Sequence, residues 1–340
     1  MKRTGRTLLV RFDALGDSLV TLPFAEAVRE SLGPDVFVAA SPRGAAAFSG
    51  CPFVSGVLEA DPGDSVAMSG LLERVREMNF ERAFVLCEKM YAYELPFRAG
   101  VPERIGFDPG IMKPFKSLLC RRLLTKRAFC ETSRKSGSIH EVERQFLLLK
   151  AAGISACPKG YSIPLRRGDL EEAGRILPGG VRIALHLSNK WLERGWTVEF
   201  LAGLAAGLSK IGGISLFATY GPPERELASV LSGLLPEVPF LGDASFGEWS
   251  ARLSLASVLV TMDTSASHVA AGVGLPSAVV FEEEFFRHTF ERWRPWMTPC
   301  EGLCRRDLRG LSARAAAEES ASFAGRVVSA AEKLLDSRRN

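Results

Sequence analysis

The sequence contains no hydrophobic run long enough to cross a membrane. No stretch reaches the roughly 18 uninterrupted apolar residues that such a helix needs. Residues 1–6 lead directly into a strand-like pattern, so the apolar core of a signal peptide is also missing. These absences predict a soluble, cytoplasmic protein.

Paired cysteines are missing as well. The seven cysteines are scattered, without a Cys-x-x-Cys pair and without histidines at zinc-binding spacing. We therefore expect reduced thiols and no bound metal. Cys300 and Cys304 are the one close pair, for which two structural thiols are the favoured interpretation and a metal or redox role the alternative.

Disorder is excluded by composition, because 46% of the 340 residues are hydrophobic and 24% are charged. This length accommodates two ordinary domains. The net charge is only +4, but it is unevenly distributed. Residues 109–135, which we call the basic segment, contain a single acid, Glu131. Its cations are Lys113, Lys116, Arg121, Arg122, Lys126, Arg127, Arg134 and Lys135. Such a run indicates either an anionic partner or a solvated face.

Strand-like runs alternate with amphipathic helical patterns, which is typical of a parallel sheet covered on both faces. The pattern occurs twice without a residue-level repeat. The expected strands are residues 7–12, 35–40, 83–87 and 104–107 in the first half, and 181–187, 214–219, 257–262 and 277–281 in the second. We predict an α/β protein with two Rossmann-like domains facing across a cleft, residues 1–160 and 161–312. A last helix within 313–340 is expected to pack back on the first domain.

The loop after the first strand is the first candidate site. It contains Asp13, Gly16 and Asp17. Asp17 has two interpretations: it is the N-cap of the next helix, or a carboxylate that accepts the proton of a substrate hydroxyl. Asp13 is the alternative for the second role.

A second candidate follows the strand at 257–262, where Asp263, Thr264 and Ser265 open a helix of small residues. Backbone N–H groups and hydroxyls at a helix start form an anion site that suits a diphosphate. His268 lies one turn further on, and we favour a ligand contact for it over a structural role.

Two further loops of the second half carry polar candidates. Glu224 follows a strand and could accept hydrogen bonds from ribose hydroxyls. Lys190 and Arg194 lie in a loop whose cations could neutralise a leaving diphosphate, with a merely solvated loop as the alternative.

Together these places resemble glycosyltransferase family nine, the ADP-heptose:lipopolysaccharide heptosyltransferases and their relatives. The family's opening Arg-x-Asp/Ser-x-Leu/Ile-Gly-Asp resembles residues 11–17. Further anchors follow in the same order: Leu22-Pro23, Arg104-Ile105-Gly106, the His-x-x-Glu-Arg of residues 140–144, Arg194-Gly195-Trp196, the Gly-x-x-Glu of residues 221–224, and the Asp-Ser/Thr-Gly-x-x-His motif of residues 263–276.

Three positions depart from the family pattern. Ser265 stands where the family has glycine after the threonine. Ser188-Asn189-Lys190 replaces the family's phosphate-loop stretch. The family's Phe/Tyr-Gly-Pro-Thr is replaced by Phe281-Glu282-Glu283-Glu284, which brings three acids toward the expected diphosphate.

The resemblance implies a metal-independent, inverting glycosyltransferase, in which Asp17 aligns with the general base. We also expect a monomer without a cofactor. We expect heptose transfer from ADP-heptose, a nucleotide-diphosphate sugar, to an inner-core lipopolysaccharide or related acidic glycan. Four cations would bind this acceptor: Lys113, Lys116, Arg121 and Arg122. We also expect peripheral contact with the inner membrane, and we expect no nucleic-acid partner. The alternatives are a nucleotide-sugar epimerase of the same fold and a non-catalytic sugar-nucleotide-binding relative.

Overall fold

A computed structural model of the chain describes residues 5–129 and 139–339. It divides into two compact units, Met1–Tyr161 and Ser162–Asn340. The part of the basic segment that contains Glu131, Arg134 and Lys135 lies outside the described residues. Among the helices that are described, none is both long and apolar enough to span a bilayer.

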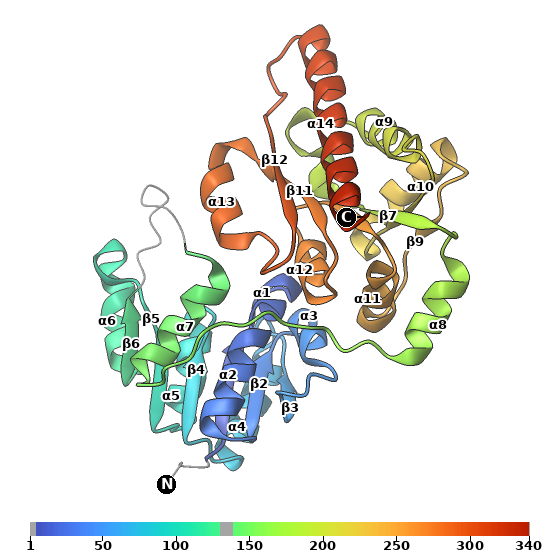
Figure 1. Cartoon of the computed structure of the whole chain (residues 1–340). Helices are drawn as coiled ribbons and strands as arrows, with labels where there is room; N and C mark the ends of the chain where they lie inside the picture. Colours follow the sequence, from blue (N-terminus) through green and yellow to red (C-terminus); the bar gives the residue numbers. More distant parts are fainter. Residues whose placement is uncertain (1–4, 130–138, 340) are drawn as a thin grey trace. The chain divides into compact units, whose positions relative to one another are not determined.

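The first unit is a six-stranded parallel sheet in the order β3-β2-β1-β4-β5-β6 (Figure 1). Its strands are β1 (Thr7–Arg11), β2 (Val36–Ala40), β3 (Gly56–Glu59), β4 (Arg82–Val85), β5 (Glu103–Asp108) and β6 (Lys126–Phe129). Its helices are α1 (Leu15–Leu19), α2 (Leu22–Leu32), α3 (Pro42–Ala45), α4 (Ser65–Glu77), α5 (Met90–Arg98), α6 (Pro114–Leu123) and α7 (Glu141–Ala151), with short 3-10 turns η1 (Ala46–Phe48) and η2 (Gly110–Met112).

Alternate residues of β1 face opposite sides of this sheet, as the pleat requires. Leu8 and Val10 belong to the core that includes Leu71 of α4 and Tyr93 of α5. On the other face, Phe24 of α2 packs edge-on against Phe84 of β4 and Phe146 of α7, with ring centroids 5.1 and 6.1 Å away. Helices therefore cover both faces, as the sequence predicted.

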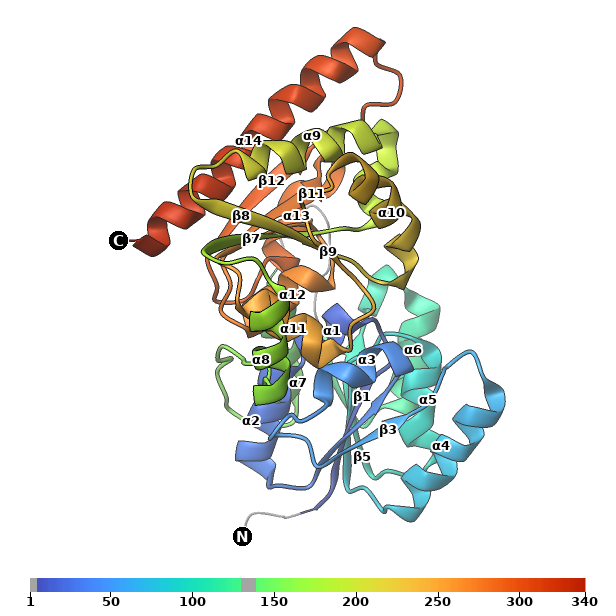
Figure 2. The same ribbon diagram turned by 90° about the vertical axis from the view of Figure 1, so that its right-hand side faces the viewer.

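The second unit repeats the architecture with the order β12-β11-β10-β7-β8-β9 (Figure 2). Its strands are β7 (Val181–His186), β8 (Ile214–Thr219), β9 (Phe240–Leu241), β10 (Val258–Met262), β11 (Ser277–Glu282) and β12 (Cys300–Arg305). Its helices and 3-10 turns are α8 (Arg167–Ile176), η3 (Asn189–Gly195), α9 (Val198–Ser209), η4 (Pro222–Glu224), α10 (Arg225–Leu234), α11 (Phe246–Ser254), α12 (Ser265–Gly272), η5 (Glu283–Phe285), α13 (Phe286–Trp293) and α14 (Ala313–Arg339).

The long C-terminal helix α14 packs on the second sheet. It belongs to the second unit, where it contacts α9 and the strands β10, β11 and β12 (Figure 2). Phe323, Val327 and Ala331 recur every four residues and are buried in the core of this unit. The apolar stripe of α14 therefore completes the cover of the second sheet. The expected packing of this helix on the first domain stays a prediction.

Candidate active site

Each of the two sheets has one point at which the order of its strands reverses. Each follows the 3-2-1-4-5-6 order of a dinucleotide-binding sheet, and the reversal lies between β1 and β4 in the first unit and between β7 and β10 in the second. Ligands bind at the carboxyl ends of the strands beside such a reversal. The loops after these four strands contain most of the predicted site residues.

In the first unit, a buried arginine organises the carboxylates at this position. The guanidinium of Arg11, the last residue of β1, lies 3.1 Å from Asp17 Oδ1 and 3.4 Å from Asp13 Oδ2. It also donates to the carbonyl oxygen of Leu86 beyond β4, at 2.5 Å. Arg11 therefore bridges the two strands of the reversal and holds both predicted base candidates on one side chain.

Asp17 is not a helix cap. Ala14 occupies the N-cap position of α1, no side-chain hydrogen bond caps that helix, and Asp17 lies inside its first turn. The side chain is 29% exposed. Desolvation raises the pKa of Asp17, opposed by the positive charge of Arg11 and assisted by the neighbouring Asp13 and Glu141. The N-cap interpretation was wrong, and a partly exposed carboxylate with a raised pKa has the properties of a general base.

The thiol of Cys87 shares the carboxylate of Asp13. Its Sγ lies 3.4 Å from Asp13 Oδ1, and burial together with that negative charge raises the pKa of Cys87 to about 12. The thiol therefore stays protonated and donates to Asp13. Asp13 has two neighbours that hold it, Arg11 and Cys87, and Asp17 is the more exposed of the two carboxylates.

The His-x-x-Glu-Arg motif forms the start of α7. His140 caps the helix by accepting from the backbone N–H of Val142 at 3.2 Å, and the Glu143 side chain accepts from the backbone N–H of His140 at 3.1 Å. Arg144 is buried, lies 3.3 Å from Glu141, pairs with Glu88 and stacks over the ring of Phe107. The motif is connected to the carboxylate cluster through Glu141, whose Oε1 lies 3.8 Å from the guanidinium of Arg11.

The four predicted acceptor-binding cations lie on α6 and at its start. Lys116 donates to the carbonyl oxygen of Glu88, just beyond β4, at 2.7 Å. Lys113 and Arg122 are exposed, and Arg121, also exposed, lies 3.9 Å from Asp108. Lys116 therefore contacts the loop after the switch-point strand β4, while the other three lie on the surface of α6 and at its start.

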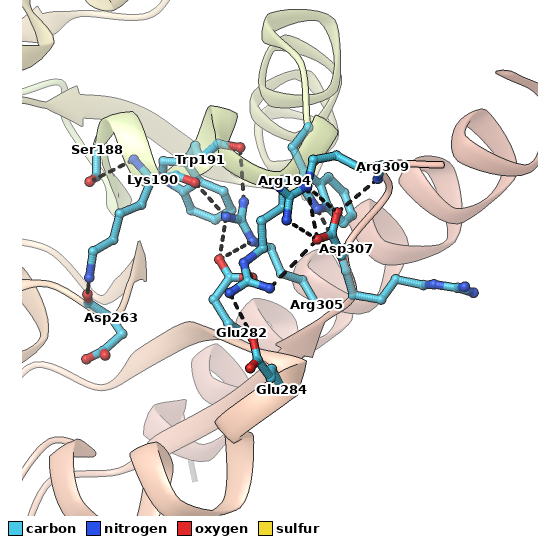
Figure 3. A network of polar contacts seen from close by, with 12 residues as sticks. Ser188, Lys190, Trp191, Arg194, Asp263, Glu282, Glu284, Arg305, Asp307 and Arg309 are labelled. Carbon is cyan, nitrogen blue, oxygen red and sulfur yellow. Dashed lines mark hydrogen bonds and ion pairs between the residues drawn. The ribbon is translucent and has the colours of Figure 1, made fainter. Parts of the chain in front are cut away.

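In the second unit, Lys190 joins the two loops of the reversal. Its Nζ donates to the carbonyl oxygen of Asp263 at 2.5 Å, from the η3 loop after β7 to the loop after β10 (Figure 3). The side chain of Thr264 caps α12 by accepting from the N–H of Ala266 at 3.3 Å. A lysine and a helix start thus lie together, as an anion site requires.

The departure at Ser265 leaves the backbone of this helix start unstrained. Ser265 is the first residue of α12, and serine adopts a helical conformation freely. His268 is buried on the same helix, with its ring 6.0 Å from that of Trp293 of α13. Its contact with a donor stays a prediction.

Glu224 has a local partner. Its Oε1 accepts from the backbone N–H of Asn189 at 3.3 Å, and the Asn189 side chain donates to the carbonyl oxygen of Pro223 at 3.1 Å. Glu224 therefore links the η4 turn after β8 to the loop of Lys190. Glu224 thus lies close to the carboxyl end of β7, one of the two strands of the reversal. Its contact with a ribose stays a prediction.

Two acids of the Glu282-Glu283-Glu284 replacement, Glu282 and Glu284, pair with arginines. Arg305, the fully buried last residue of β12, donates twice to Glu282 Oε1, at 2.6 and 3.0 Å, and to the carbonyl oxygens of Lys190 and Trp191 at 2.5 and 3.0 Å. Arg194 lies 3.2 Å from Glu282, 3.3 Å from Glu284 and 3.8 Å from Asp307 (Figure 3). The guanidinium of Arg194 is thus engaged by three carboxylates.

Sequence reasoning missed Arg305 and His186. Arg305 ends a strand whose mixed pattern, Cys-Glu-Gly-Leu-Cys-Arg, does not indicate a strand. His186 ends β7 at the reversal, with Nδ1 2.9 Å from Thr219 Oγ1 and its ring beside that of Trp249. Burial lowers the pKa of His186 to about 4, so this imidazole is neutral at pH 7. A histidine at the carboxyl end of the central strand was the signal available in the sequence.

Comparison with protein families decides the class. The model of glycosyltransferase family 9 (heptosyltransferase) matches residues 68–309, which is most of the chain. The protein belongs to glycosyltransferase family 9. It is therefore a glycosyltransferase. No curated protein matches its sequence.

Solved structures share the fold of this family 9 enzyme. A family 9 glycosyl transferase from Veillonella parvula has a TM-score of 0.79 at 17% identity, with 98% of each chain covered. Escherichia coli ADP-heptose lps heptosyltransferase II has a TM-score of 0.71 at 16% identity, covering 94% of this chain and 99% of that one. Escherichia coli heptosyltransferase WaaC with ADP has a TM-score of 0.66 at 20% identity, covering 94% and 99%. These likenesses show the GT-B fold with its two parallel sheets.

Within this family 9 enzyme, the matched region begins after the carboxylate cluster. Asp13 and Asp17 precede residue 68, whereas Lys190, Thr264, His268 and the acidic triplet lie inside the match. The assignment of the base therefore rests on the geometry around Arg11. Two of the three acids after Phe281, Glu282 and Glu284, are paired with Arg194 or Arg305.

Proposed function

We propose that this family 9 enzyme is an inverting, metal-independent transferase that moves heptose from ADP-heptose to an acidic acceptor of the lipopolysaccharide inner-core type. The observation that carries the proposal is that each unit presents a suited group at its own strand reversal: the Arg11–Asp17 pair in one, Lys190 beside the start of α12 in the other. Two Escherichia coli WaaC structures, one with ADP and one with ADP-2-deoxy-2-fluoro heptose, support this donor class.

The chemical step is a direct displacement. Asp17 takes the proton of an acceptor hydroxyl while that oxygen attacks the anomeric carbon of the sugar. The bond from this carbon to the diphosphate oxygen breaks, and ADP leaves with the electron pair. Attack opposite to the leaving group inverts the anomeric centre. Arg11 holds the carboxylate of Asp17 in place. The raised pKa of Asp17 makes this carboxylate a stronger base than that of an ordinary aspartate.

Stabilisation of the leaving group falls to the second unit. Lys190 and the N–H groups at the start of α12 are positively polarised donors that need no rearrangement to meet the developing diphosphate charge. Glu224 holds the ribose, and Asp263, Ser265 and His268 shape the same loop. Arg194 acts on the donor through the loop it anchors, because three carboxylates already surround its guanidinium.

The acceptor is held by cations of the first unit. Lys116, beside the residues that follow β4, meets an acidic group close to the reacting hydroxyl. Lys113, Arg121 and Arg122 meet phosphates or carboxylates further along the acceptor. An acidic glycan suits this surface better than a neutral one.

A transfer assay tests the proposal. Purified full-length protein is incubated with ADP-heptose, with and without a delipidated inner-core acceptor, and the products are followed by mass spectrometry and NMR. We expect ADP and a heptosylated acceptor of inverted anomeric configuration. Conversion of the sugar nucleotide without acceptor would instead indicate an epimerase, and binding without turnover would indicate a non-catalytic relative. Either result contradicts the proposal.

A further inference from the structure

Helix α6 turns apolar side chains outward as well as inward. Ser117, Cys120 and Leu123 are buried on the side that faces β5. On the opposite side, at helical spacing, Phe115 is 86% exposed, Leu118 is 67% exposed and Leu119 is exposed too. A helix with an ordinary solvated face carries polar residues there. This outer stripe therefore requires an explanation other than the core of the unit.

The stripe continues beyond the helix. The η2 turn that precedes α6 exposes Ile111, which is 94% accessible, and Met112. The ring of Phe129, exposed at the end of β6, lies beside Gly110 at the start of that turn. We call this set the α6 patch: Ile111, Met112, Phe115, Leu118, Leu119 and Phe129. An exposed apolar surface of this kind marks an interaction site.

Positive charge surrounds the α6 patch. Residues 109–129 contain six lysines and arginines and no acid. Arg122 continues the outer stripe one turn after Leu118 and Leu119, Arg121 lies next to it, and Lys113 stands between the η2 turn and α6. Of the nearby acids, Glu103 pairs with Lys126, and Asp108 pairs with Arg127 at 2.9 Å and lies 3.9 Å from Arg121.

We infer that the α6 patch docks on the surface of an anionic phospholipid bilayer. Phe115, Leu118 and Ile111 enter the boundary between headgroups and acyl chains, while Lys113 and Arg122 meet lipid phosphates. The combination of apolar insertion and basic charge is what an interfacial helix uses to bind reversibly. A second copy of this chain is disfavoured as the occupant, because a twofold contact would set the same cations against each other.

The position of the α6 patch suits this role. α6 covers the edge of the first sheet, where β6 is the terminal strand (Figure 1). The cations proposed to bind the acceptor belong to the same helix and its start. An acceptor held in a membrane by its own lipid would thus meet the unit that we propose to bind it. The docking itself depends on the α6 patch and its neighbouring cations, and it stands apart from the proposed reaction.

Vesicle binding tests the inference. Full-length protein is floated with vesicles of phosphatidylglycerol and phosphatidylcholine, or of phosphatidylcholine alone. We expect binding to the anionic vesicles only, partly reduced by 0.5 M salt. Phe115→Ser with Leu118→Ser should weaken that binding by at least about tenfold, because two inserted apolar side chains are lost. The matched control is Val230→Ser with Leu234→Ser, two exposed apolar residues four apart on α10, which should bind as the wild type does.

Three results would overturn the docking: no binding to anionic vesicles, equal binding by the Phe115/Leu118 variant, or a dimer in solution that this variant dissociates. The transfer assay with the delipidated acceptor separates this inference from the proposed function. The Phe115/Leu118 variant should transfer to that acceptor at the wild-type rate. Vesicle binding without transfer contradicts the proposed reaction alone, and transfer without vesicle binding contradicts the docking alone.

Discussion

At the scale of single residues, Arg11 decides what the two aspartates can do. Its guanidinium contacts Asp13 and Asp17 and is itself buried, so both carboxylates share one positive charge. A shared counter-charge leaves the cluster negative. Desolvation, assisted by the neighbouring carboxylates, therefore raises the pKa of Asp17 despite an arginine at 3.1 Å.

Replacing the base should abolish transfer and spare donor binding. Asp17→Asn keeps the shape of the side chain and removes its ability to take a proton, so we expect kcat to fall by roughly 10²–10⁴-fold. ADP affinity, measured by calorimetry, should remain unchanged. The opposite pattern, full activity in Asp17→Asn and loss in Asp13→Asn, would reassign the base to Asp13.

The pH profile gives an independent check of the same residue. Asp17 is active when ionised, so transfer should fall as the pH drops through its raised pKa, above the usual range of an aspartate. In Asp13→Asn one neighbouring negative charge is gone, which lowers the pKa of Asp17. The acid limb of kcat/KM should therefore move to lower pH in this variant. A limb that does not move argues against a coupling between the two carboxylates.

At the scale of elements, the loop of Lys190 is placed by a strand more than 100 residues away. Arg305 of β12 donates to the carbonyl oxygens of Lys190 and Trp191 and to Glu282 of β11. Its guanidinium also lies 5.6 Å from the centre of the Trp196 ring. The η3 loop is thus fixed by side-chain hydrogen bonds, because a 3-10 turn has few backbone bonds of its own.

Arg305→Met should release this loop. It leaves the Lys190 and Trp191 carbonyl groups without their donor and Glu282 with Arg194 alone, so we expect a loss of about 3 kcal/mol in unfolding free energy. KM for the donor should rise at least about tenfold, with a smaller change in kcat. Glu282→Gln added to Arg305→Met should recover stability but not the KM, since the carbonyl contacts remain lost.

The matched control for that experiment is Arg309→Met. Arg309 is exposed and pairs with Asp307 at the outer edge of the same network. A surface pair of this kind contributes little, so both stability and KM should stay close to the wild type. Equal effects of the two substitutions would contradict a positioning role for Arg305.

At the scale of the whole molecule, the two units can be observed separately. All five tryptophans follow residue 161, so tryptophan fluorescence reports the unfolding of the second unit. This matters because a chain of two units need not unfold in one step. His186, buried in that unit beside Trp249, is the group whose protonation we expect to detect in this way.

The second unit should lose stability as the pH falls below 6.5. The pKa of His186 is lowered to about 4 in the fold, and an unfolded histidine titrates near its ordinary value, so the unfolded state binds the proton first. Between pH 7 and pH 5 this effect amounts to about 2 kcal/mol. Over the same interval, the unfolding free energy of His186→Gln should fall by about 2 kcal/mol less than that of the wild type, measured by urea unfolding with tryptophan fluorescence. Identical pH dependence in both proteins would contradict a neutral buried His186.

Local pattern predicted much of the fold. Strands expected at 7–12, 214–219 and 277–281 agree with β1, β8 and β11 within one residue, because central strands of a parallel sheet are continuous apolar runs. The strands that escaped prediction, such as β6 and β12, carry charged residues along their length. Edge strands tolerate such residues, so their pattern is no longer distinct from that of a loop.

The sequence by itself determined the α/β class, the two domains and the loops after strand ends that carry Asp17, Lys190 and Thr264. These follow from periodicity and from short-range order, which act within a few residues. Only the tertiary structure decided that Arg11 holds Asp17, that Arg194 and Arg305 pair with Glu282 and Glu284, that α14 covers the second sheet, and that α6 turns apolar residues outward. Each of these depends on contacts between segments distant in the chain, which local pattern does not encode.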